Sequence, residues 1–94
     1  MSGGLYFEAH VTLGAEHLGP ANVVVAAQHP TWHVSCLQGD EVLGPEMRVY
    51  LSKRHQDLRL LQFDLIDLCG YLEKIGVRWQ RRKIEVAILD ERSV

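Results

Sequence analysis

The chain has 94 residues, of which 47% are hydrophobic and 23% are charged, as in an ordinary globular domain. This composition excludes a disordered chain, a collagen-like repeat and a low-complexity tail, and the length allows one hydrophobic core. We therefore expect a single domain that spans residues 1–94. The formal net charge of −2 argues against binding to duplex nucleic acid, or to a membrane surface, through a basic patch.

The N-terminal residues and the two cysteines indicate a cytoplasmic protein. Residues 1–4 do not begin a basic and then apolar leader. The longest apolar run, residues 23–27, is far shorter than a membrane span of about 20 residues. Cys36 and Cys69 each lie inside an apolar pattern, so we expect reduced, buried thiols rather than a disulfide or a metal site.

The first half of the chain predicts a strand followed by a short helix. In residues 5–13, five apolar residues alternate with polar ones, which is typical of a strand buried on one face. We expect a loop at 14–19. Pro20 suits the first turn of a helix, and we expect that helix at 21–28, before Pro30.

The middle of the chain predicts a pair of strands. Alternation of apolar and polar residues favours one strand at 31–37 and another at 47–53. Turn-forming residues at 38–40 and 44–45 separate them. We therefore expect a hairpin.

The last third predicts a long helix and a final strand. Asp57 offers an N-cap, leucines recur at spacings of three and four, and Gly76 suits the end of the helix. The final strand is expected at 82–89, with a bulge or a late strand start near residues 81–82. Residues 90–94 are expected to form a polar tail.

The element order is βαββαβ, which is the split βαβ arrangement of the ferredoxin-like fold, an α+β class. We expect a four-stranded antiparallel sheet with two helices on one face and, by analogy with that fold, strands in the order 4-1-3-2. The helix leucines should pack against the inward residues of the strands, which are Phe7, Val11, Val34, Val49, Ile84 and Val86. This fold hosts many unrelated functions, so it identifies none.

The other face of the sheet should carry the polar residues of the strands. A polar, solvated sheet face needs no function, but this one mixes imidazoles, hydroxyls, carboxylates and cations, which favours a binding surface. The candidate ligand-binding residues are Glu8, Thr12, Ser35, Arg48, Tyr50, Lys83 and Glu85. We expect His10 to lie in a hydrogen-bonded cluster with Glu8, Lys83 or Glu85, outside the core.

Residues 10–13 (HVTL) and 33–36 (HVSC) each read His, apolar, hydroxyl, apolar on a strand. They resemble the paired H-x-T/S motifs of the 2H phosphoesterases, in which two histidines act as acid and base and the hydroxyls hold the phosphate. The resemblance implies catalytic roles for His10 and His33, about 10 Å apart by strand spacing. The chain also resembles small bacterial domains with a first strand E-x-H-x-T and a last strand K-I-E, a type without an assigned activity.

Two classes of function remain open. In the first, the open face binds a small anionic ligand, and histidine-based acid–base chemistry is an extension of that binding. In the second, the chain is a non-enzymatic interaction module that forms a homodimer through the sheet face or an edge strand. We predict no cofactor and no bound metal, because His10, His33, Glu8 and Glu85 suit zinc as ligand types but lack the usual short-range ligand pair.

Overall fold

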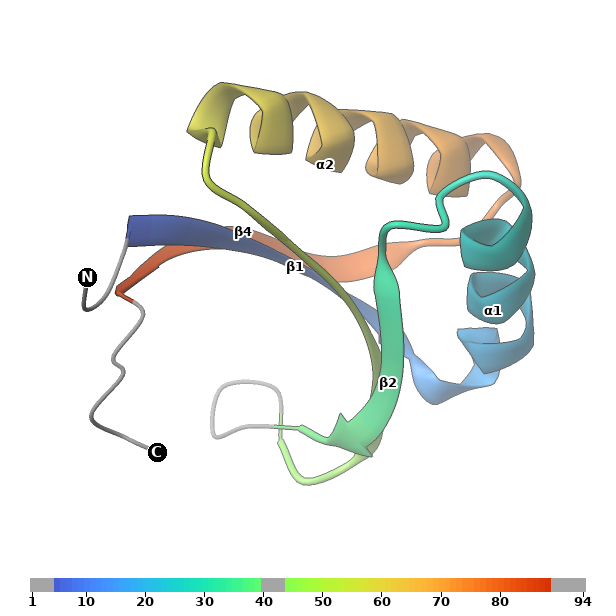
Figure 1. Cartoon of the computed structure of the whole chain (residues 1–94). Helices are drawn as coiled ribbons and strands as arrows, with labels where there is room; N and C mark the ends of the chain where they lie inside the picture. The colour runs from blue at the N-terminus through green and yellow to red at the C-terminus, as the bar shows by residue number, and fades with distance from the viewer. Residues whose placement is uncertain (1–4, 40–43, 89–94) are drawn as a thin grey trace.

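The computed structural model describes residues 5–39 and 44–88 and shows an α+β fold of four antiparallel strands and two helices (Figure 1). The elements are β1 (Leu5–Gly14), a 3-10 turn (Ala15–His17), α1 (Leu18–Ala27), β2 (His33–Gln38), β3 (Met47–His55), α2 (Leu58–Lys74) and β4 (Trp79–Ile88). The strands lie in the order β2-β3-β1-β4, so β2 and β4 form the edges of the sheet. This arrangement is compatible with a ferredoxin-like fold. The predicted turn at residue 40 and the polar tail lie outside the described residues.

One hydrophobic core lies between the sheet and the two helices. Ala21 and Val24 of α1 belong to the same buried cluster as the leucines of α2. The strand residues of this cluster alternate along β1 and β3 and are Ala9, Val11, Leu13, Val49 and Leu51. Both helices therefore cover one face of the sheet. The strands curve away from them, which leaves the opposite face concave (Figure 1).

The start of α1 differs from the predicted loop at 14–19. β1 continues to Gly14, a 3-10 turn follows, and α1 begins at Leu18. Pro20 is therefore the third residue of the helix, still within the first turn, where a backbone N–H has no partner inside the helix. The helix ends at Ala27, one residue before the predicted end.

The prediction for α2 is confirmed at both ends. The Asp57 carboxylate accepts hydrogen bonds from the backbone N–H groups of Arg59 (2.9 Å) and Leu60 (3.3 Å). Gly76 adopts a positive φ of 82° directly after the C-terminal turn, a conformation that glycine reaches without strain. The buried stripe of the helix consists of Leu61, Leu65, Leu68, Cys69 and Leu72. Among the described residues, no helix has both the length and the hydrophobicity needed to cross a membrane.

The packing of β4 corrects two predictions. Val86 was expected in the core, but it is 61% exposed, because on the edge strand β4 it is Ile84, and not Val86, that faces α2 and packs against the core. The strand also begins at Trp79 rather than at residue 82, and its register against β1 shifts by one residue opposite Thr12 and Leu13. Gln80 is the extra residue at this bulge, next to the predicted position, and it returns Trp79 to the core side of the sheet.

Candidate functional site

Strand register arranges the polar residues of the concave face in rows. Lys83 of β4 pairs with His10 of β1, His10 pairs with Ser52 of β3, and Ser52 pairs with His33 of β2. The neighbouring row contains, in the same strand order, Arg81, Thr12, Tyr50 and Ser35. Adjacent strands lie about 4.8 Å apart, so successive members of a row are close neighbours. The sheet thus brings most of the predicted site residues onto one surface.

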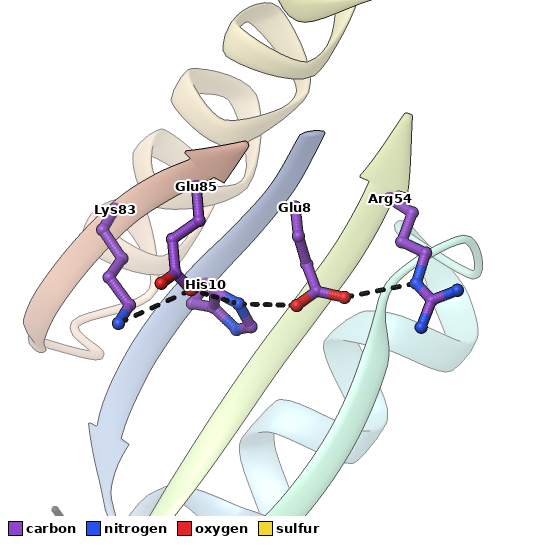
Figure 2. A network of polar contacts seen from close by, with 5 residues as sticks. All are labelled: Glu8, His10, Arg54, Lys83 and Glu85. Carbon is purple, nitrogen blue, oxygen red and sulfur yellow. Dashed lines mark hydrogen bonds and ion pairs between the residues drawn. The ribbon is translucent and has the colours of Figure 1, made fainter. Parts of the chain in front are cut away.

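His10 lies at the centre of a network of polar contacts near the β4 edge (Figure 2). Its Nε2 atom is 3.0 Å from Glu8 Oε1 and 3.2 Å from Glu85 Oε1. The second oxygen of Glu8 is 3.2 Å from Arg54 Nε, and Glu85 Oε1 is 3.6 Å from Lys83 Nζ. The prediction that His10 belongs to such a cluster, rather than to the core, is confirmed.

A hollow of about 410 Å³ adjoins this network on the concave face. Its polar lining comes from all four strands and consists of His10, Thr12, Ser35, Gln38, Tyr50, Ser52, Arg81, Lys83 and Glu85. Four of these residues carry hydroxyl groups. The charged groups of this lining are those of Arg81, Lys83 and Glu85, and Lys83 is paired with Glu85.

His33 lies in a different, smaller hollow of about 240 Å³, together with Glu8, Ser52 and Arg54. It is two strands away from His10, which corresponds to about 10 Å, and Ser52 stands between the two histidines and lines both hollows. A ligand confined to the larger hollow therefore contacts His10 but not His33. Only a longer ligand that passes over Ser52 reaches both.

Arg48 does not line either of these hollows. It donates from Nε to Gln80 Oε1 (2.9 Å) and from a terminal nitrogen to the backbone carbonyl of Glu46 (3.0 Å). The first of these bonds ties β3 to the bulge of β4. The structure therefore does not bring Arg48, a predicted binding residue, into either hollow.

Several residues that line the two hollows were missing from the predicted binding set, among them Gln38, Ser52, Arg54 and Arg81. Arg54 holds the outer oxygen of Glu8, and Ser52 joins the two hollows. The predicted strand ended at residue 53, so Arg54 lay outside it and was not assigned to either face of the sheet. Continuing the same alternation by one residue would have placed Arg54 beside Tyr50 and Ser52 on the open face.

Cys69 lies in α2, on the helix-covered side of the sheet. Burial raises the pKa of its thiol, and a hydrogen bond with Arg82 offsets this effect in part. The thiol is therefore held in its protonated, weakly nucleophilic form, and its role is packing. The prediction of a buried thiol is confirmed for Cys69, whereas Cys36 on β2 is only partly buried.

The arrangement on the concave face suits two kinds of chemistry. Cationic side chains and hydroxyl groups hold an anion through charge-assisted hydrogen bonds, and an imidazole that contacts carboxylates transfers protons. The ligand atoms of Glu8, His10 and Glu85 also lie within 4.8 Å of one another, a set of donor types that suits a metal ion.

Comparisons of the chain with family models, with curated proteins and with solved structures gave no significant match.

Proposed function

We propose that the concave face binds a small anionic ligand of the phosphate class in the hollow beside His10. The donor groups of the hollow carry this proposal: four hydroxyl groups lie in its lining together with the ammonium group of Lys83 and the imidazole of His10. Glu8, which would otherwise repel an anion, is paired with Arg54. Cationic and hydroxyl donors of this kind form charge-assisted hydrogen bonds with a negative ligand.

The hydroxyl groups supply directional contacts for the oxygens of such a ligand. Thr12 and Tyr50 lie in the row next to His10, and Ser52 lies in the same row. His10 is the acid–base candidate, because it both lines the hollow and contacts two carboxylates. An acid–base pair with His33, as in the 2H phosphoesterases, requires a ligand that spans both hollows.

A titration of the histidine ring signals by NMR tests the proposal. Inorganic phosphate should shift the His10 signals, and a longer ligand such as AMP or a cyclic nucleotide phosphate should also shift those of His33. The signals of His17, His29 and His55 serve as internal controls, because these residues line neither hollow. Shifts restricted to these three residues, or no shifts at millimolar ligand, would contradict an anion site on this face.

We also infer that the topology is ferredoxin-like. The element order βαββαβ supports this assignment, as do the two edge positions of β2 and β4 and the packing of both helices on one face. The fold accounts for the open face without specifying its ligand.

A second candidate function is a homodimer formed through β4. Within the described parts of the chain β4 pairs with β1 alone, which leaves its other edge unpaired. An antiparallel pairing of two copies centred on Ile84 places Lys83 of each copy opposite Glu85 of the other. Centring the pairing on Lys83 or on Glu85 instead places like charges opposite each other. The charge pattern of the strand thus favours one symmetric register.

The groove between α2 and β4 supplies apolar area for this contact. It has a volume of about 520 Å³, and its lining includes Phe63 (64% exposed) and Ile66 (61% exposed). Sedimentation analysis should show a dimer that Phe63→Lys dissociates, whereas Leu37→Lys, on the other edge strand, leaves it intact. A monomeric wild-type chain, or dissociation by Leu37→Lys alone, would rule out this interface.

A further inference from the structure

The cluster around His10 brings three metal-ligand atoms to one point of the concave face. Glu8 and His10 are two residues apart on β1, so their side chains leave the same face of the strand. Glu85 stands directly opposite Glu8 on β4. All three side chains therefore project from paired, rigid backbone, and Figure 2 shows that both carboxylates turn toward the imidazole.

The distances between these atoms match those within a metal coordination sphere. For metal–ligand bonds of about 2.0–2.1 Å, neighbouring ligand atoms in tetrahedral or octahedral geometry lie about 2.9–3.4 Å apart. His10 Nε2 is 3.0 Å from Glu8 Oε1 and 3.2 Å from Glu85 Oε1, and all the ligand atoms lie within 4.8 Å of one another. Only a small movement of the two flexible carboxylates is needed to close the sphere.

We propose that Glu8, His10 and Glu85 bind a divalent transition-metal ion. One imidazole nitrogen and two carboxylate oxygens suit Zn²⁺, Mn²⁺ or Co²⁺, whereas Mg²⁺ and Ca²⁺ prefer oxygen ligands alone. This proposal replaces the prediction that no metal binds. That prediction relied on the absence of the usual short-range ligand pair, but Glu8 and His10 lie two residues apart on β1, and the strand pairing brings Glu85 beside them.

Two cations contact the carboxylates of this site and can alter its affinity for a metal ion. Arg54 Nε contacts Glu8 Oε2 at 3.2 Å, which leaves Oε1 directed toward His10, as an outer hydrogen bond orients a carboxylate ligand. Lys83 Nζ is 3.6 Å from Glu85 Oε1, the oxygen that the metal would take. Metal binding thus competes with Lys83 for Glu85 and leaves the ammonium group to an anion in the hollow.

Three protein ligands leave coordination positions on the metal open to water or to a ligand oxygen. His10 and Glu85 both line the hollow of about 410 Å³, so these open positions can face it. The ligand class then narrows to an anion that coordinates a metal through an oxygen, such as a phosphate. This choice of ligand class rests on the proposed anion site, whereas the proposal of a metal site does not.

Titration of the full chain with Zn²⁺ alone, followed by calorimetry, tests the metal site. We expect one saturable equivalent, and His10→Ala and Glu85→Gln should each weaken binding by at least tenfold. His33→Ala is the matched control, because it removes an imidazole from the same face but not from the cluster. In parallel, Mn²⁺ should broaden the amide NMR signals of residues 8–10 and 83–85 first.

Absence of saturable Zn²⁺ binding would overturn the proposal, as would unchanged affinity in folded His10→Ala. Equal weakening by His33→Ala would also overturn it, because the ion would then not be held by the cluster. The anion site is judged separately, by adding inorganic phosphate with and without Zn²⁺. Zn²⁺ binding without any response to phosphate retains the metal site and rejects the anion site.

Discussion

Replacing Leu68 with alanine should lower the free energy of unfolding by about 2–5 kcal/mol, the range for truncation of a buried leucine. Leu68 is fully buried at the centre of the inner stripe of α2. Its removal leaves a cavity in the one core that joins both helices to the sheet. The measurement is urea denaturation at equilibrium, with the m-value compared between variants.

The same substitution at Leu60 is the matched control. Leu60 lies in the same helix but is 49% exposed, so we expect a loss below about 1 kcal/mol. If Leu68→Ala leaves too little folded protein, Leu68→Met keeps the volume and should cost less than about 1.5 kcal/mol. Equal losses for Leu68→Ala and Leu60→Ala would show that α2 does not dock on the sheet through the predicted stripe.

Replacing Lys83 with glutamine should weaken phosphate binding by about tenfold, which corresponds to about 1.4 kcal/mol. Lys83 lines the hollow and lies in the same row as His10, so its ammonium group is placed to pair with an anion there. The substitution also removes one cation from the field of the hollow, so the dependence of affinity on salt concentration should become weaker. Calorimetric titrations at two salt concentrations measure both effects.

Lys74→Gln provides the control for net charge. Lys74 lies in the last turn of α2, which packs on the other face of the sheet, so its removal changes the total charge by the same amount without altering the hollow. Its phosphate affinity should stay within twofold of wild type. If both variants lose affinity equally, phosphate responds to the overall charge and not to this site.

The parts of the fold that the sequence predicted well are those set by local pattern. The apolar stripe of α2, the cap at Asp57 and the stop at Gly76 each follow from residues close together in the chain. The alternation in β1 likewise fixed which side chains face the core. Because a strand has a period of two, this also placed His10 on the open face.

The details of the site depend on long-range register and on the curvature of the sheet, which alternation does not encode. Glu8 lies opposite Glu85 because of the register in which β1 pairs with β4. These two residues are about 77 positions apart in the chain. The division of the concave face into two hollows, with His10 in one, His33 in the other and Ser52 in both, depends on side-chain packing that the sequence pattern did not predict. Val86 was misplaced for a related reason, since its alternation is correct but α2 does not cover the edge strand at that position.

The most direct test of the central claim, that the concave face binds a phosphate-class anion, is a crystal structure of the protein grown with inorganic phosphate. We predict a tetrahedral anion in the hollow of about 410 Å³, with Lys83 Nζ and at least one hydroxyl group of Thr12, Tyr50 or Ser52 at hydrogen-bond distance. A hollow that contains only water at saturating phosphate would contradict the claim. So would phosphate bound only at other surfaces of the protein.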